Sequence, residues 1–129
     1  MLSPVVLGIS DVDRAVGFYD AVLGTLGYGR RWVAESGAGY GTRDELGIDT
    51  FWLTKPIDGC PPTVGNGTNV AFVAQSRKAV RNFYDKALAL GGTSEGRPGI
   101  REEAHPNFYA AYVRDLDGHK IVAVCHHSE

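Results

Sequence analysis

One arrangement of apolar and polar positions occurs twice along the chain. An apolar run at 5–9 (VVLGI) precedes a stretch whose apolar residues recur every three or four positions, and the same order returns 65 residues later, from 70–74 (VAFVA). The triplet FYD stands in both copies, at 18–20 and 83–85. Such spacing is typical of an amphipathic helix, so each copy predicts a strand followed by a helix. The apolar helix positions are Val12, Ala15, Val16, Tyr19, Val22, Leu23 and Leu26 in the first copy and Val80, Phe83, Tyr84, Ala87 and Leu88 in the second.

Capping signals indicate where both helices begin and end. Ser10, with Asp13 three residues on, resembles a capping box in which Asp replaces the usual Glu, and Ser76 is the matching N-cap in the second copy. Glycine follows each helix, at Gly27 and at 91–92, and glycine favours the left-handed turn that ends many helices.

Strand-like pieces follow each helix. They are RRWVAES (30–36), GYGT (39–42) and DTFWLT (49–54) in the first copy, and a weak stretch at 93–97, NFYAAYV (107–113) and HKIVAVC (119–125) in the second. Asp117-Gly118, between the last two pieces, predicts a hairpin turn. Each half is therefore predicted to be a βαβββ unit.

The two units are expected to form one α+β domain. Half of a 129-residue chain is too short to bury a stable core alone. We therefore predict two pseudo-symmetric βαβββ modules with curled mixed sheets that form a cleft. Module one covers 1–54 and module two 68–126, and the linker between them, 55–67, is rich in proline and glycine.

Composition and charge exclude several classes of partner. The chain is 43% hydrophobic and 22% charged, as in an ordinary globular protein, and its net charge is −2 without a long block of one sign. We therefore expect neither nucleic-acid nor membrane binding. No apolar run is long enough to span a bilayer and no signal pattern opens the chain, so a cytoplasmic protein is expected, with Cys60 and Cys125 reduced.

The order of elements, the doubled FYD and the closing DLDGHKIV (115–122) resemble the vicinal oxygen chelate superfamily. That superfamily includes glyoxalases, extradiol dioxygenases, fosfomycin-resistance enzymes and bleomycin-binding proteins. The resemblance covers the whole chain. The superfamily's closing signature is usually DPDGHxIE, so the turn matches while the residues around it differ.

The resemblance implies a metal site in the cleft, and the ligand positions test whether this chain keeps it. Metal-dependent members bind a divalent ion through His on the first and fifth strands, Glu on the last, and a further carboxylate from the strand that ends module one. The residues here are Pro4, Asn69, Val122 and, to within one residue, Phe51. Three of these side chains offer no ligand atom, and an amide oxygen is a poor ligand for a transition metal. We expect no metal ion and no other cofactor in the cleft.

The histidines do not replace the missing ligands. His126 and His127 are adjacent, so they would point to opposite sides of a strand, and we expect them in a solvated tail. His119 stands at the DGH turn, where it is expected to brace the hairpin.

Strand alternation predicts which side chains line the cleft instead. The cleft-facing set is Val6, Gly8, Asn69, Ala71, Val73, Lys120, Val122 and Val124, whereas Val5, Leu7 and Ile9 cover the helix. Such a floor suits an organic ligand held by shape. Asn69 either anchors this ligand or satisfies local backbone at the strand edge. Phe51 and Tyr40 are further candidates for the pocket wall.

The segment 96–112 (GRPGIREEAHPNFYAAY) is predicted to be an irregular loop because Pro98, Gly99 and Pro106 interrupt it. Functional residues are often carried on such loops. Arg101 is suited to pair with a ligand carboxylate, and His105 to transfer a proton with Glu103 orienting it. Tyr109 completes the predicted ligand-binding set of Asn69, Arg101, His105, Tyr109, Phe51 and Tyr40. The alternative is a solvated loop whose charges pair with one another.

Two functions remain open. The first is a homodimer that binds a small organic molecule in its cleft without the metal ion, as the bleomycin-binding branch does. The second is a glyoxalase-like lyase or a dioxygenase-type enzyme, with a displaced metal or acid–base chemistry through His105 and Glu103. The missing ligands favour the first.

Overall fold

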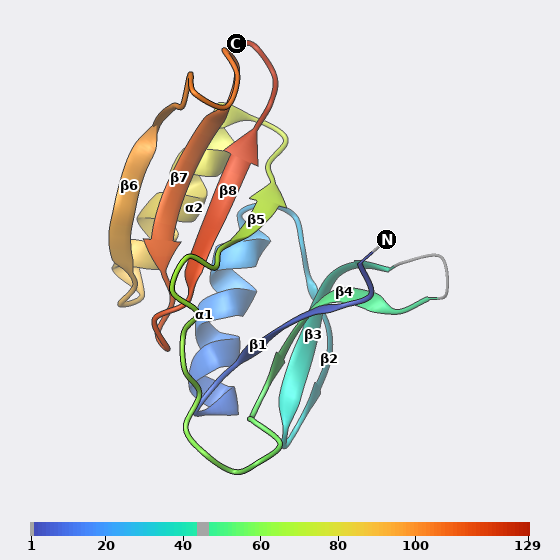
Figure 1. Ribbon diagram of the computed structural model, residues 1–129. Helices are drawn as coiled ribbons and strands as arrows, with labels where there is room; N and C mark the ends of the chain where they lie inside the picture. Colours follow the sequence, from blue (N-terminus) through green and yellow to red (C-terminus); the bar gives the residue numbers. More distant parts are fainter. Residues whose placement is uncertain (1, 44–46) are drawn as a thin grey trace.

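The computed structural model describes residues 2–43 and 47–129, and its secondary structure has the same order in both halves (Figure 1). Module one contains β1 (Val5–Gly8), α1 (Val12–Gly24), β2 (Arg30–Ala34), β3 (Gly37–Arg43) and β4 (Asp49–Thr54). Module two contains β5 (Val70–Val73), α2 (Arg77–Ala89), β6 (Thr93–Ile100), β7 (Tyr109–Arg114) and β8 (Lys120–Cys125). The predicted α+β fold of two βαβββ modules is confirmed.

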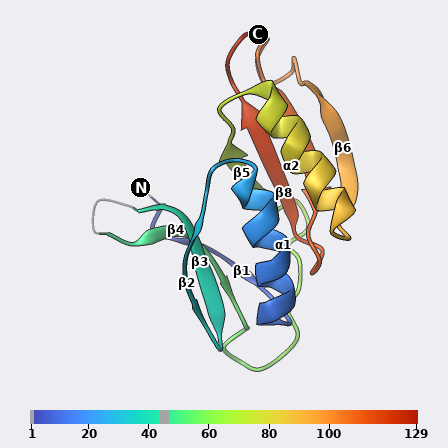
Figure 2. The same ribbon diagram turned by 180° about the vertical axis from the view of Figure 1, so that it is seen from behind.

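Each module builds a four-stranded mixed sheet. Sheet one has the order β1-β4-β3-β2 and sheet two the order β5-β8-β7-β6. In both, the strand before the helix runs parallel to the last strand of the module, and the other pairs are antiparallel. Figure 2 shows α1 and α2 together on the near side, with sheet two behind α2 and sheet one beside α1. Neither sheet is closed, so each has a helix side and, facing away from the helices, an open face.

The helix sides of both sheets share one hydrophobic core. Phe18 and Tyr19 of α1 are 2% and 1% exposed, and Phe83 of α2 is fully buried. They belong to a single cluster that also includes inward-facing residues of β1, β4, β7 and β8. The modules are thus stabilised by packing on each other, because neither helix face would be covered in a half-chain.

The helix starts differ at one position from the prediction. Ser76 caps α2 as predicted, its hydroxyl accepting a hydrogen bond from the N–H of Ala79 at 3.1 Å. In α1, however, the N-cap is Asp11, whose carboxylate accepts from the N–H of Arg14 at 2.8 Å. Ser10 instead donates its backbone N–H and hydroxyl to Asp117 of module two. Ser10, which the local sequence favours as the N-cap, is therefore used for a contact between the modules.

The segment 96–112 is more regular than predicted. β6 continues to Ile100 and β7 begins at Tyr109, so only 101–108 connects them. Pro98 is tolerated because β6 is an edge strand, and its pairing with β7 shifts register on both sides of Gly96. The prediction of an irregular loop over this whole segment is wrong.

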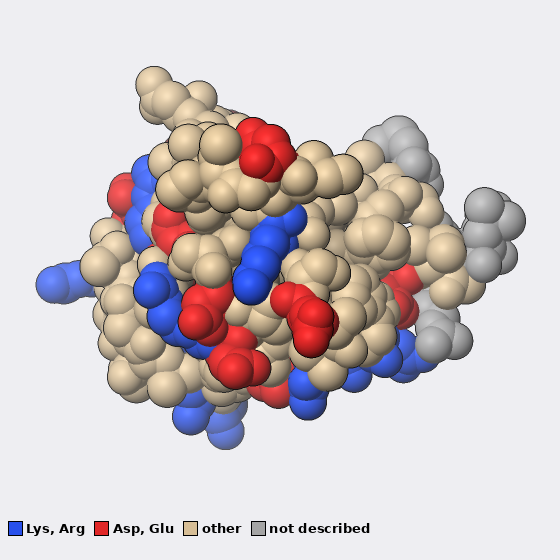
Figure 3. Space-filling view, turned by 90° about the horizontal axis from the view of Figure 1, so that it is seen from below, with Lys and Arg blue, Asp and Glu red and all other residues tan. Residues whose placement is uncertain are grey.

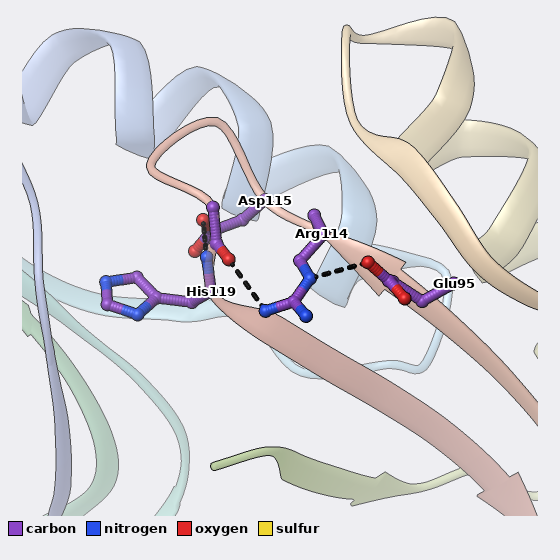
Figure 4. A network of polar contacts seen from close by, with 5 residues as sticks. Glu95, Arg114, Asp115 and His119 are labelled. Atoms are coloured by element: carbon purple, nitrogen blue, oxygen red, sulfur yellow. Dashed lines mark hydrogen bonds and ion pairs between the residues drawn. The ribbon is translucent and has the colours of Figure 1, made fainter. Parts of the chain in front are cut away.

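Hydrogen bonds from the DLDGH turn of module two join the two modules. Figure 4 shows Asp115 and His119 of this turn, next to Arg114 and Glu95. Asp115 is 5% exposed, and its carboxylate accepts hydrogen bonds from the Tyr19 hydroxyl at 2.5 Å and from the N–H groups of Asp117 and His119, both at 2.9 Å. The His119 ring donates through Nε2 to the carbonyl of Gly8 at 2.6 Å. His119 therefore braces the turn against β1, as the sequence predicts.

The surface carries charges of both signs. Figure 3 shows acidic and basic side chains side by side on the face seen from below. Within the described residues, no helix has the length and apolar character needed to cross a membrane.

Candidate functional site

The open face of sheet one carries a row of apolar and aromatic residues. Val6 pairs with Trp52, Trp52 with Gly39, and Gly39 with Trp32. Val6 is 45% exposed whereas its neighbour Leu7 is 7% exposed, which assigns the row to the side away from the helices. The alternation is therefore the one predicted for the first strand.

The two indole rings form a pair above a glycine. The centroids of Trp32 and Trp52 are 5.5 Å apart, and the rings meet edge to face at 87°. A Cβ atom at Gly39 would stand 2.0 Å from Nε1 of Trp32, so this ring can cover the strand only because residue 39 has no side chain. Trp52 Nε1 is buried without a hydrogen-bond partner among the described residues. The face thus combines aromatic surface with an unused donor.

The open face of sheet two has a different chemistry. Ala71 pairs with Val122, Val122 with Tyr112, and Tyr112 with Gly96. Tyr112 and Phe108 pack on a small cluster made by Ala110, Val122 and Val124, which is separate from the main core. The charged ends of Lys120 and Arg101 both lie near the Tyr112 ring, each 5.3 Å from its centroid.

The residues at the superfamily's ligand positions do not fit a metal ion. Pro4 and Asn69 precede β1 and β5, and Val122 lies in the middle of β8. On β4 the residue that pairs with Val6 and faces the open side is Trp52, whereas Phe51 points to the helix side. The ligand position therefore falls on the residue next to Phe51, within the one-residue range that the sequence gives. An indole is no better as a ligand than a phenyl ring. Across 2–43 and 47–129, no group of three His, Cys, Asp or Glu side chains could hold a metal ion.

Phe51 and Tyr40 lie in the core and beneath a small pocket. Phe51 is 4% exposed and packs between Tyr19 and Phe72, and Tyr40 is fully buried. The Tyr40 hydroxyl donates to Asp20 at 2.8 Å, and burial with this hydrogen bond raises its pKa strongly. The pocket above them, of about 180 Å³, is shared by both modules and is lined by Leu23, Tyr28, Tyr40, Gly41, Thr42, Thr50, Phe51, Ala71, Phe72 and Val73.

Tyr109 belongs to the helix side of sheet two. It packs against the main core, Arg77 of α2 lies over its ring at 5.1 Å, and Arg81 donates to its hydroxyl at 3.4 Å. Tyr109 and Arg101 therefore lie on opposite sides of the sheet.

His105 is held by residues other than Glu103. Its Nδ1 accepts from the N–H of Asn107 at 3.0 Å, so in the neutral ring the proton is on Nε2, which lies 2.8 Å from Nδ1 of His126. The centroids of the two imidazoles are 5.1 Å apart, which equals this nitrogen separation plus two ring radii. The rings therefore meet in line, edge to edge, as in a hydrogen bond. His126 is exposed, as the sequence predicts for the tail. Its contact with His105 was not predicted.

Arg101 and Asn69 occupy positions suited to the predicted role. Arg101 is half-buried on the open face of sheet two, and Asn69 is exposed one residue before β5. Asn69 has the strand parity of Ala71, which lies on the open face. Glu103 is exposed in the short 101–108 connection.

Sequence reasoning missed the three aromatic residues that dominate the open faces, Trp32, Trp52 and Tyr112. Trp52 could have been found by pairing DTFWLT with the first strand, since the register that buries Leu7 opposite Leu53 places Trp52 opposite Val6. To place Tyr112 on the open face, the register between β7 and β8 must be known, and the sequence alone does not give it.

Two larger pockets are lined by other parts of the chain. One, of about 340 Å³, lies at the linker, where Pro56, Cys60 and Pro62 line it together with Ile9. The other, of about 500 Å³, lies between the start of α1 and the β2–β3 hairpin, and carries Asp11, Asp13, Glu35 and Lys55. Neither holds a residue that the sequence predicts to be functional.

Known structures share this fold and, in one case, much of the sequence. A glyoxalase/bleomycin resistance protein from Albidiferax ferrireducens T118 is 40% identical, with 97% of this chain and 98% of that one covered and a TM-score of 0.84. A glyoxalase-related enzyme from Fulvimarina pelagi (17% identity, 97% and 87% covered, TM-score 0.74) and the fosfomycin resistance protein FosX from Listeria monocytogenes (17%, 97% and 92%, 0.66) share the fold. No protein-family model and no curated protein matches the chain.

Proposed function

The chain belongs to the glyoxalase/bleomycin resistance protein family, and from that premise we propose that it binds a small organic molecule between its open faces without a metal ion. The observation that carries this proposal is the chemistry of the matched positions. Where metal-dependent members of the superfamily carry imidazole and carboxylate, this chain carries Pro4, Trp52, Asn69 and Val122. Three of these side chains are apolar or aromatic and the fourth is a neutral amide, which suits shape recognition of an organic body with few polar anchors.

We further propose that two copies of the chain complete each binding site. Val6 on sheet one is 45% exposed, and Val73 on sheet two is 52% exposed. A small-molecule site usually buries most of its ligand, which a single uncovered sheet cannot do. A two-fold axis that brings sheet one of one copy against sheet two of the other would create two equal clefts and cover both faces.

The test uses the protein purified from its native cells. We expect a compound of low molecular mass to be released on denaturation and identified by mass spectrometry, less than a tenth of an equivalent of Ni, Zn, Fe or Mn after dialysis, and a dimer by light scattering. One equivalent of metal would contradict the proposal if it persists in the His126→Asn/His127→Asn variant and is lost in Asn69→Ala. Truncation after Cys125 would also remove both histidines, but it would remove Glu129 as well, which accepts a hydrogen bond from the N–H of Arg77. The double substitution keeps this contact and is therefore the better control.

Acid–base catalysis is the second candidate, and the in-line contact of His105 with His126 is the observation that favours it. Linked imidazoles can pass a proton from one ring to the other. If the isolated compound is a substrate, fresh protein should convert it and His105→Gln should not. An unchanged compound after incubation would support binding alone.

A further inference from the structure

The guanidinium of Arg101 lies along the open face of sheet two, in space left by two glycines. Gly96 and Gly99 pair with Tyr112 and Ala110, so both are on the open face. A Cβ atom at Gly96 would stand 3.1 Å from Nη2 of Arg101, and one at Gly99 would stand 3.2 Å from Nη1. The order Gly-x-x-Gly-x-Arg therefore gives the side chain a groove along the edge strand.

Two backbone carbonyls hold the guanidinium in this groove. Nη1 donates to the carbonyl of Gly99 at 2.8 Å, and Nη2 to that of Arg97 at 2.7 Å. An arginine has five N–H donors, so further donors remain for a ligand. Because the side chain is already fixed, a ligand that binds it loses little additional conformational entropy.

Among the charged residues on the open face of sheet two, Arg114 has a carboxylate partner and Arg101 has none within the described residues. Arg114, on the same face, is paired with Glu95 at 2.8 Å, and Lys120 also helps to lower the pKa of Glu95. Within the described part of the chain, no carboxylate forms an ion pair with Arg101. Two cations thus lie near the Tyr112 ring. Lys120 is close enough to Glu95 to affect its pKa, whereas the charge of Arg101 is not neutralised by a carboxylate of the described residues.

Resting on the proposed binding function of the open faces, we propose that the ligand is a planar organic carboxylate. Its carboxylate would bind the Arg101 guanidinium, with Lys120 adding charge, since the planar fork of arginine matches a carboxylate. Its flat body would lie on the Tyr112 ring. In the two-fold assembly, Trp32 and Trp52 of the second copy supply the opposite wall.

Intrinsic fluorescence offers a direct measurement, because Trp32 and Trp52 are the two tryptophans of the chain and both lie on the open face of sheet one. Three probes of nearly equal shape differ in charge: benzoate, benzamide and benzamidine. We expect benzoate to change the emission with saturation, benzamide to bind at least ~10-fold more weakly, and benzamidine not to compete. Inorganic phosphate should displace benzoate only weakly, because it lacks the flat body.

The variants assign the selectivity to Arg101. Arg101→Gln should weaken benzoate binding about 10- to 100-fold and leave benzamide binding unchanged. Arg101→Lys should recover part of the difference, since it keeps the charge without the fork. Arg97→Gln is the matched control: it removes an exposed charge four residues away and keeps the carbonyl that holds Arg101, so benzoate should bind as before. Far-ultraviolet circular dichroism checks that each variant is folded.

The outcomes separate this inference from the binding function. Equal affinity for benzoate and benzamide, or an unchanged preference in Arg101→Gln, would overturn the carboxylate inference while organic binding stands. Phosphate binding as tightly as benzoate would show a site for inorganic anions and overturn the planar body. No response to any probe would overturn the inference, and the binding function would then be judged by the compound isolated with the protein.

Discussion

The two modules share their helix sides and differ on their open faces. Phe18 and Phe83, which are equivalent by the 65-residue repeat, are both buried in the common core. On the open faces, sheet one presents Trp32 and Trp52 above Gly39, whereas sheet two presents Tyr112 with two cations. Packing in the common core requires the same apolar pattern in both halves. The open faces are outside this core, so their side chains can differ between the two sheets. Each half therefore presents a different chemistry on its open face.

The junction between the modules is expected to be the most sensitive point. Asp115→Ala removes the acceptor of the buried Tyr19 hydroxyl and of two backbone N–H groups. We expect the free energy of unfolding to fall by about 3 kcal/mol, measured by urea denaturation, because those donors lose their partner in a dry environment. The control is Asp117→Ala, whose exposed contact with Ser10 should contribute less than about 1 kcal/mol. Equal effects would show that the buried hydrogen bonds of Asp115 stabilise the junction no more than the exposed contact of Asp117.

The stability of the protein should fall at alkaline pH because two tyrosine hydroxyls, those of Tyr19 and Tyr40, are buried. Burial and the neighbouring Asp115 raise the pKa of Tyr19, and burial with the Asp20 hydrogen bond raises that of Tyr40. Below pH 10 folded and unfolded chains both keep these protons; above it the unfolded chain loses them first. Stability should therefore be constant up to about pH 10 and then fall by up to ~1.4 kcal/mol per tyrosine per pH unit.

The measurement for this alkaline loss is urea denaturation at steps of pH from 8 to 11. Tyr40→Phe should reduce the slope, because it removes one of the two buried hydroxyls whose pKa is raised in the folded chain. A stability that stays constant up to pH 11 in the unmodified protein would contradict the assignment of Tyr19 and Tyr40 as protected groups.

Gly39→Ala tests the aromatic face. The added methyl group would collide with the Trp32 indole, which must then leave the strand surface. We expect a loss of about 2 kcal/mol and a change in tryptophan emission. In Gly17→Ala the Cβ meets no atom within 4 Å and the site is helical, so this control should be neutral or stabilising and leave the emission unchanged. Unaltered emission in Gly39→Ala would mean that Trp32 is not seated on the glycine.

The equivalent tyrosines of the two FYD segments give the smallest and most direct comparison. Tyr19→Phe should cost roughly 1 kcal/mol, since it leaves a buried carboxylate oxygen of Asp115 without this donor. Tyr84→Phe removes a more exposed hydroxyl contact with Ser94 and should cost less than about 0.5 kcal/mol. Thermal unfolding of both variants measures the difference, and equal costs would show that the two positions have equivalent environments.

The sequence predicted the fold well because local periodicity and packing agree in both halves. DTFWLT became β4 over the predicted residues, and Ser76 caps α2. Predictions failed where a long-range contact competes with a local signal. Ser10 is a suitable N-cap, but Asp117 is its partner, so Asp11 caps the helix one residue later. Pro98 suggested a loop, but an edge strand accommodates a residue without an N–H.

The candidate site was predicted less completely, for a geometric reason. Alternation along one strand is visible in sequence, and it correctly separates Val6 from Leu7. Which residue of a later strand shares that face depends on register, and a shift of one residue moves every side chain to the other side. This is why the sequence predicts Phe51 and Tyr109 for the binding site, whereas the structure places Trp52 and Tyr112 on the open faces. Arg101 was identified from its charge, but its groove over Gly96 and Gly99 was not.

The sequence by itself determined the repeated βαβββ order, the apolar helix sides and the absence of imidazole and carboxylate from the superfamily's ligand positions. These follow from residue type and from periods of two and 3.6 residues, which any local segment carries. Tertiary structure alone decided that Asp115 and Tyr19 join the modules, that two indoles share one face, and that a guanidinium lies beside Tyr112 on the other. Those contacts join residues far apart in the chain or depend on strand register, so no local pattern specifies them.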